Sequence, residues 1–142
     1  MKKIIISAIF LATTVMACKK GDSGTNTCTT NMASIAGSYK TIAVKYKAGN
    51  TAPEQDLFTI LPACEKDDII KLYVNGTADY QDAGTACTPN NSYSSTWSVN
   101  GNSITMDGTA GTIQLFDCKK LVVMGTGALV PGDILTVTYE KQ

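Results

Sequence analysis

Polar and apolar residues alternate along much of the chain, beginning at Gly37. Over residues 37–46, the members of one face are Tyr39, Thr41 and Ala43, and those of the other are Ile42, Val44 and Tyr46. Alternation of this kind, with β-branched and aromatic residues, is typical of a β-strand. The sequence therefore predicts a strand over residues 37–46.

The same pattern recurs between turn signals over the rest of the chain. Asn75-Gly76 and Asn100-Gly101 are dipeptides that favour tight hairpin turns. Further strands are predicted over residues 69–74, 77–81, 92–99, 103–107, 111–116, 121–125 and 133–140. About eight short strands with regular turns indicate an all-β fold, an antiparallel barrel or sandwich. Pairing of the last strand with the first would close a barrel and leave no exposed edge.

The segment from Pro53 to Leu61 has a different pattern. Acidic residues stand early in it, apolar residues follow, and Pro62 comes next. Proline and acidic residues are favoured in the first turn of a helix. We predict one short helix here, lying across the mouth or base of the sheet.

The first 17 residues have the organisation of an export signal. Lys2 and Lys3 precede an apolar run from Ile4 to Leu11, and small residues follow up to Ala17. This order is typical of a cleavable secretory signal peptide. A membrane-spanning helix needs about 20 apolar residues, which is more than this run provides. We therefore predict a signal peptide over residues 1–17.

The end of this segment, Val15-Met16-Ala17-Cys18, resembles the bacterial lipobox. The resemblance implies that Cys18 receives a lipid and becomes the mature N-terminus. The alternative is an ordinary signal peptide that happens to end near a cysteine. We expect the first case, and with it a membrane partner through the lipid on Cys18. The expected location is the bacterial cell envelope, at the outer membrane, with the periplasmic and surface faces both open.

The residues after Cys18 are polar and include two glycines, which is typical of a flexible tether. We predict a tether over residues 18–34 and one domain over residues 35–142. The precursor has twelve lysines and twelve acidic residues. It has no arginine and no histidine, so a nucleic-acid partner, serine or cysteine catalysis through histidine, and most zinc sites are not expected. We expect no enzyme activity, no cofactor and a monomer.

Four cysteines remain in the domain and its tether, Cys28, Cys64, Cys87 and Cys118. An even number in an exported small domain indicates two disulfides, for which three pairings are possible. We prefer Cys64–Cys87 with Cys28–Cys118. Metal binding is the rival interpretation, and the wide spacing without a histidine disfavours it.

Two groups of side chains are candidates for binding. The aromatic residues Trp97, Tyr39 and Tyr139 could line a ligand pocket, although aromatic side chains more often fill the core of a small barrel. The acidic residues Asp67 and Asp68 with Glu65 offer the oxygen ligands that calcium requires. A solvated turn is the favoured interpretation of that group, so no metal site is predicted.

The order of several short motifs resembles the lipocalin-like domain of Bacteroidetes-type lipoproteins, over about residues 35–141. The motifs are Gly37-Ser38-Tyr39-Lys40, Cys64-Glu65-Lys66-Asp67-Asp68-Ile69, Asn75-Gly76-Thr77, Cys87, Ser95-Thr96-Trp97-Ser98 and Asn100-Gly101-Asn102. The resemblance implies an all-β, antiparallel lipocalin-like barrel. The family usually has tryptophan at the position of Tyr39.

Two functions fit these observations. The first is an envelope binding module without catalysis that holds a small apolar ligand at the barrel mouth. The second is a protein-interaction module, such as an inhibitor or an accessory subunit of an envelope complex, that uses surface loops of a solid barrel. The loop over residues 125–131 is the candidate surface for the second function. A cavity in the barrel discriminates between them.

Overall fold

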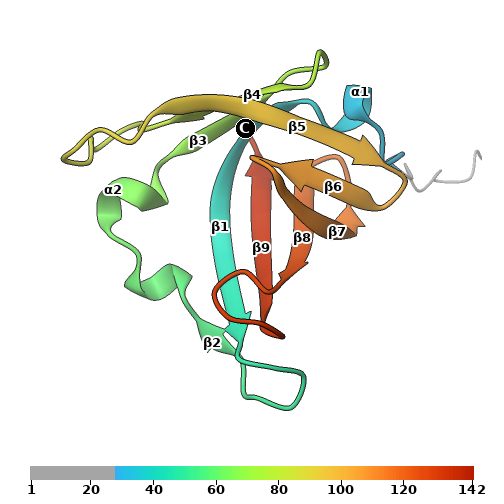
Figure 1. The fold of residues 1–142 in the computed structure, drawn as a ribbon. Helices are drawn as coiled ribbons and strands as arrows, with labels where there is room; N and C mark the ends of the chain where they lie inside the picture. The colour runs from blue at the N-terminus through green and yellow to red at the C-terminus, as the bar shows by residue number, and fades with distance from the viewer. Residues whose placement is uncertain (1–27) are drawn as a thin grey trace, which may run out of the picture.

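Antiparallel strands form one continuous sheet in the computed structural model, which describes residues 28–142 (Figure 1). The sheet order is β2-β1-β3-β4-β5-β6-β7-β8-β9. The strands are β1 (Gly37–Lys47), β2 (Gln55–Asp56), β3 (Ile69–Leu72), β4 (Thr77–Gln81), β5 (Tyr93–Asn100), β6 (Ser103–Met106), β7 (Thr109–Phe116), β8 (Lys120–Thr126) and β9 (Ile134–Lys141). The signal peptide, Cys18 and most of the predicted tether lie outside the described residues.

The sheet closes on itself because β9 also pairs with β1. The pairing runs from Tyr39 opposite Lys141 to Lys47 opposite Ile134. Eight strands thus form a ring, and β2 is a short addition that pairs only with the far part of β1, at Lys45 and Tyr46. The predicted barrel of about eight strands, closed by its first and last strands, is confirmed.

Both predicted hairpin turns are present. Gly76 and Gly101 have φ angles of +87° and +58°, a backbone region that glycine enters without steric cost. A third tight turn joins β6 to β7 through Asp107 and Gly108, with φ angles of +51° and +74°. Positive φ at both central residues matches the turn type whose twist suits a hairpin, and Asp-Gly is a favoured sequence for it.

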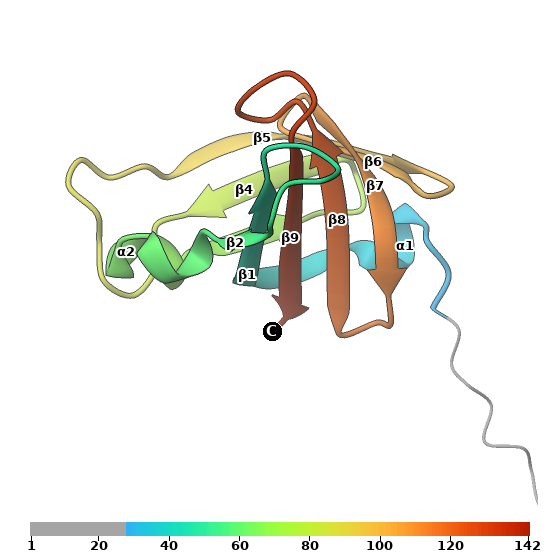
Figure 2. The ribbon, with the colours of Figure 1, turned by 90° about the horizontal axis from the view of Figure 1, so that it is seen from below.

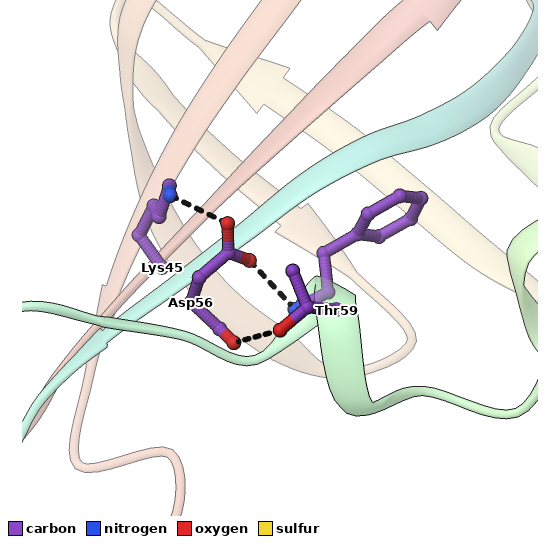
Figure 3. A network of polar contacts seen from close by, with 4 residues as sticks. Lys45, Asp56 and Thr59 are labelled. Carbon is purple, nitrogen blue, oxygen red and sulfur yellow. Dashed lines mark hydrogen bonds and ion pairs between the residues drawn. The ribbon is translucent and has the colours of Figure 1, made fainter.

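The helix predicted over residues 53–61 is present only in part. One short 3₁₀ turn, η1 (Phe58–Ile60), lies in the segment, β2 occupies its predicted start, and an α-helix, α2 (Ala63–Lys66), follows Pro62. Asp56 explains the difference. Its carboxylate accepts from Lys45 Nζ at 2.8 Å and from the Phe58 N–H at 3.0 Å, and its carbonyl accepts from Thr59 Oγ1 (Figure 3). The bond from Lys45 holds Asp56 against β1 in an extended segment, so the helical turn begins only after it, at Phe58.

The barrel core lies at the end where the described chain begins. The helix α1 (Met32–Ile35) places Ile35 in a cluster with Tyr39, Leu72, Ala78, Trp97, Ile104, Ile113 and Leu121. We call this the closed end. The opposite, open end carries the β1–β2 connection and the β8–β9 loop, residues 127–133 (Figures 1 and 2).

Residues 28–34, which were assigned to the tether, are folded against the closed end. Asn31 caps α1 by accepting from the Ser34 N–H at 2.9 Å, and Lys141 Nζ donates to the Ser34 carbonyl at 3.0 Å. Cys28 is bonded to Cys118, in the turn between β7 and β8. The ordered structure therefore begins before residue 35.

The preferred disulfide pairing is confirmed. Cys28 is bonded to Cys118 and Cys64 to Cys87. The second bond ties α2 to the long connection between β4 and β5. The first fixes the start of the described chain to the closed end of the barrel.

Candidate ligand-binding cavities

Two adjoining cavities occupy the open half of the barrel. The first has a volume of ≈ 300 Å³ and the second ≈ 250 Å³. Small-molecule sites have volumes of about 300–1,000 Å³, so the first cavity is at the lower limit, the second is just below it, and the two together suit a small ligand. Tyr80, Tyr93 and Val137 line both of them.

The two cavities differ in the chemistry of their walls. The second is mainly apolar, with Ile104, Met106, Ala110, Val123, Ala128, Leu135 and Tyr139 among its lining residues. The first is mixed, and three of its lining residues are acidic: Glu65, Asp68 and Asp82. A mixed compartment that carries acidic groups thus adjoins a more apolar compartment, and the shared residues lie between them.

The shared tyrosines are brought together by strand pairing. Tyr80 on β4 lies directly opposite Tyr93 on β5, and their rings stack with centroids 4.5 Å apart and planes 5° from parallel. Burial raises the pKa of Tyr80 well above its ordinary value, with a contribution from the neighbouring Tyr93. Burial and the hydrogen bond to Asp107 also raise the pKa of Tyr93. Both rings are therefore neutral phenols at physiological pH.

A β-bulge decides which residues of β1 face the first cavity. The register with β9 shifts between Thr41 and Ala43. Because an extra residue at a bulge interrupts the alternation of faces, Thr41 and Val44 both line the cavity. Strict alternation had placed these two residues on opposite faces, so the sequence pattern alone misassigned the inner face beyond the bulge.

The turn between β6 and β7 brings a carboxylate to the second cavity. Asp107 accepts hydrogen bonds from Tyr93 Oη at 3.1 Å and from Ser95 Oγ at 2.6 Å. The residue also lines the second cavity. The bond from Ser95 fixes the carboxylate of Asp107, and the bond from Tyr93 fixes the position of the tyrosine ring in the cavity wall.

The three acidic residues of the first cavity have different environments. Asp82 accepts the Cys87 N–H with both carboxylate oxygens, at 3.0 and 2.9 Å. Burial raises the pKa of Asp68, and the nearby charges of Asp82, Asp67 and Glu65 add to the rise, while the Ala83 N–H opposes it. Oδ1 of Asp68 is buried and has no hydrogen-bond partner among the described residues.

These acidic side chains are not arranged as a metal site. Within residues 28–142, no three histidine, cysteine, aspartate or glutamate side chains are grouped so that they could hold a metal ion. Asp67, named with Asp68 as a calcium candidate, accepts from the Thr85 N–H at 2.8 Å instead. The acidic turn thus fastens the β4–β5 connection.

The β8–β9 loop forms part of the rim of the second cavity through Ala128. Asp133, which is fully buried, accepts from the N–H groups of Ala128, Leu129 and Val130 at 2.8, 2.8 and 2.9 Å. Burial raises the pKa of Asp133, but these backbone N–H groups outweigh it and hold the pKa below its ordinary value. One carboxylate therefore fixes the shape of the loop.

Of the three aromatic residues considered as ligand contacts, only Tyr139 lines either cavity. Burial raises the pKa of Tyr139 to about 12. Tyr39 and Trp97 belong to the core at the closed end, where they are 1% and 2% exposed. Tyr39 Oη donates to the Ile35 carbonyl at 2.5 Å, and Trp97 Nε1 donates to the Tyr73 carbonyl at 2.8 Å.

Sequence reasoning missed Tyr80 and Tyr93 as cavity residues. Both stand in predicted strands, and each is an aromatic residue near the strand end that lies toward the long β4–β5 connection. The signal that could have found them is their position opposite each other on neighbouring strands. The Asn75-Gly76 hairpin sets the register of β3 with β4, and the pairing of β4 with β5 then places Tyr80 opposite Tyr93.

The fold and the cavities define the class of this protein as a small antiparallel β-barrel with an internal binding compartment. Residues 35–119 match the family model of the lipocalin-like domain, and the chain belongs to that family. The comparisons with curated proteins and with solved structures find no match. None of the helices within residues 28–142 is long and apolar enough to cross a membrane. The lipocalin-like fold is generally a non-enzymatic binding fold, which indicates a binding module.

Proposed function

We propose that this protein is a lipid-anchored binding module of the bacterial cell envelope that holds a small apolar or amphipathic ligand without catalysing a reaction. The pair of adjoining cavities at the open end of the barrel is the observation that supports this function. The alternative of a solid barrel predicts that side chains fill this space. The apolar wall of the second cavity provides the burial that drives binding of apolar groups.

The lipid anchor is proposed at Cys18 and rests on the lipobox-like sequence before it. The Cys28–Cys118 disulfide is consistent with this proposal, because it fastens the chain at the closed end. A tether that reaches the membrane from there leaves the open end facing away from the lipid surface. The cavity would then be accessible from the aqueous side of the envelope.

Binding is tested by titrating small apolar and amphipathic compounds into the full chain and measuring heat and mass shifts. Val137 lines both cavities, so Val137→Phe is expected to fill the space between them and abolish binding. Its neighbour Thr136 points to the other face of β9, because side chains alternate along a strand. Thr136→Phe adds a ring of the same size and should leave binding intact. Equal binding by both variants would contradict the cavity as the site.

One observation favours the protein-interaction function as a second candidate. Leu129 and Val130, in the loop fixed by Asp133, are 64% and 47% exposed. An exposed apolar pair on a structured loop suits contact with a protein partner. A photo-crosslinker at position 129 would trap one envelope protein in cells if this candidate is correct. Ligand binding that depends on Val137, without such a crosslink, would favour the first function.

A further inference from the structure

The charges of the cavity walls are of one sign. The acidic residues are Glu65, Asp68 and Asp82 in the first cavity and Asp107 in the second. No lysine lines either cavity, and the chain has no arginine or histidine. A ligand in this space therefore meets carboxylates and no cationic side chain.

Of the three lysines near the open end, Lys47 lines neither cavity, and the other two are bound elsewhere. Lys45 donates to Asp56 at 2.8 Å (Figure 3), and Lys66 donates to the Thr59 carbonyl at 3.0 Å with its ammonium 5.7 Å from the centre of the Phe58 ring. Neither residue lines the first cavity. A ligand carboxylate or phosphate would thus be buried near several like charges without compensation, which is unfavourable.

Asp68 is the carboxylate with most to gain from a positive charge. Its Oδ1 is buried without a hydrogen-bond partner among the described residues, and the same holds for Oδ1 of Asp67, which lines neither cavity. The neighbouring acidic groups, Glu65, Asp67 and Asp82, repel its charge. A cation close to Asp68 would offset this repulsion.

The rest of the space suits an apolar body attached to such a cation. The stacked rings of Tyr80 and Tyr93 line both the mixed first cavity and the apolar second cavity. Aromatic faces attract ammonium groups as well as apolar chains. The apolar second cavity then takes the remainder of the molecule.

We propose that the ligand is a small cationic amphiphile, an amine on an apolar body, with its charge near Asp68 in the first cavity and its apolar part in the second. This inference rests on the proposed ligand-binding function. It names the charge of the ligand, which the family and the fold leave open.

Three probes of equal length separate the charge from the apolar body: octylammonium, 1-octanol and octanoate. Titration into the full chain at neutral pH should give octylammonium an affinity about tenfold above that of octanol, the effect of one charge-assisted hydrogen bond. Octanoate should bind weakest. Octanoate binding as tightly as octylammonium would overturn the inference.

Two variants make the test specific to Asp68. Asp68→Asn should remove the preference for octylammonium and leave the affinity for octanol unchanged. Glu54→Gln removes an exposed negative charge from the loop before β2 that lines neither cavity, and should keep the preference. A preference that survives Asp68→Asn overturns the inference.

The outcomes also separate this inference from the proposed function. Binding of octanol with no advantage for octylammonium refutes the cationic ligand but retains a ligand-binding cavity. Binding of none of the three probes contradicts both. Thermal unfolding of each variant shows that it is folded before it is titrated.

Discussion

Tyr80 and Tyr93 stack face to face across the β4–β5 pairing, with ring centroids 4.5 Å apart. The pair lines both the mixed first cavity and the apolar second cavity, and Tyr93 donates a hydrogen bond to Asp107. The stack is therefore both a structural contact between two strands and a wall of the binding site.

Replacing Tyr93 by alanine should weaken binding more than it weakens the fold. Tyr93 is 46% exposed, so little core packing is lost, whereas both cavities lose a wall. Apolar ligand surface buried against the ring is worth about 25 cal/mol per Å², so the affinity for octanol and octylammonium should fall several-fold, as calorimetry can measure. Tyr93→Phe is the matched control: it keeps the ring, loses only the bond to Asp107, and should retain octanol binding.

The two disulfides should differ in what they contribute to stability. The Cys28–Cys118 bond spans 90 residues and the Cys64–Cys87 bond spans 23. In the chain-entropy model, such loops are worth about 4.5 and about 3.5 kcal/mol. Urea unfolding should therefore show a larger loss of unfolding free energy for Cys28→Ser with Cys118→Ser than for Cys64→Ser with Cys87→Ser. A reversed order would show that the entropy of the unfolded chain does not dominate.

Local signals in the sequence predicted most of the barrel. Asn-Gly dipeptides gave two hairpins, and the alternation of residues 133–140 gave the strand that closes the ring. These features depend on residues close together in the chain. The start of the segment from Pro53 to Leu61 was misassigned as helix because Asp56 pairs with Lys45 on a different strand. A helix-like order of residues carries no information about that contact.

The site was harder to predict than the fold for a related reason. Alternation shows which side chains point inward but not how deep along the barrel they lie. Tyr39 and Trp97 both point inward, yet α1 covers the end where they lie and packs Ile35 beside them. Tyr80 and Tyr93 lie nearer the open end, where the cavities are. The β1 bulge, which places Val44 on the inner face, has no recognisable signature in the sequence.

Cys18, which lies outside the described residues, is predicted to carry the membrane anchor. Cys18→Ala should abolish incorporation of a labelled fatty acid in a bacterial host that processes lipoproteins, and should release the protein from the membrane fraction. Cys28→Ser, which removes a cysteine bonded within the fold, should leave incorporation unchanged. Labelling of the Cys18→Ala protein would mean that the lipid is attached elsewhere or that the lipobox assignment is wrong.

The buried carboxylate of Asp133 should make the β8–β9 loop sensitive to acid. Backbone N–H groups hold its pKa below the ordinary aspartate value of about 3.9 despite the effect of burial. Its stabilisation is therefore complete above that value and is lost as the pH falls through the lowered pKa. Asp133→Asn should lower the melting temperature at pH 7, and the difference from the native chain should shrink near pH 3. A difference that does not change with pH would assign the effect to packing instead.

Asp68 should show the opposite dependence on pH. Because burial and neighbouring carboxylates raise its pKa in the folded chain, the ionised form is less favourable when folded than when unfolded. Its destabilising effect is absent below the ordinary aspartate pKa, grows as the pH rises from there to the raised value, and is complete above it.

Asp68→Asn should therefore raise the melting temperature of the ligand-free chain at pH 7 and lose this advantage in acid, while Glu54→Gln should have little effect. The same substitution is expected to weaken binding of octylammonium. A variant that is more stable but binds the cation less tightly would show that Asp68 destabilises the fold and contributes to ligand binding. A lower melting temperature at pH 7 would instead show that Asp68 stabilises the turn and would remove the energetic reason for a cation beside it.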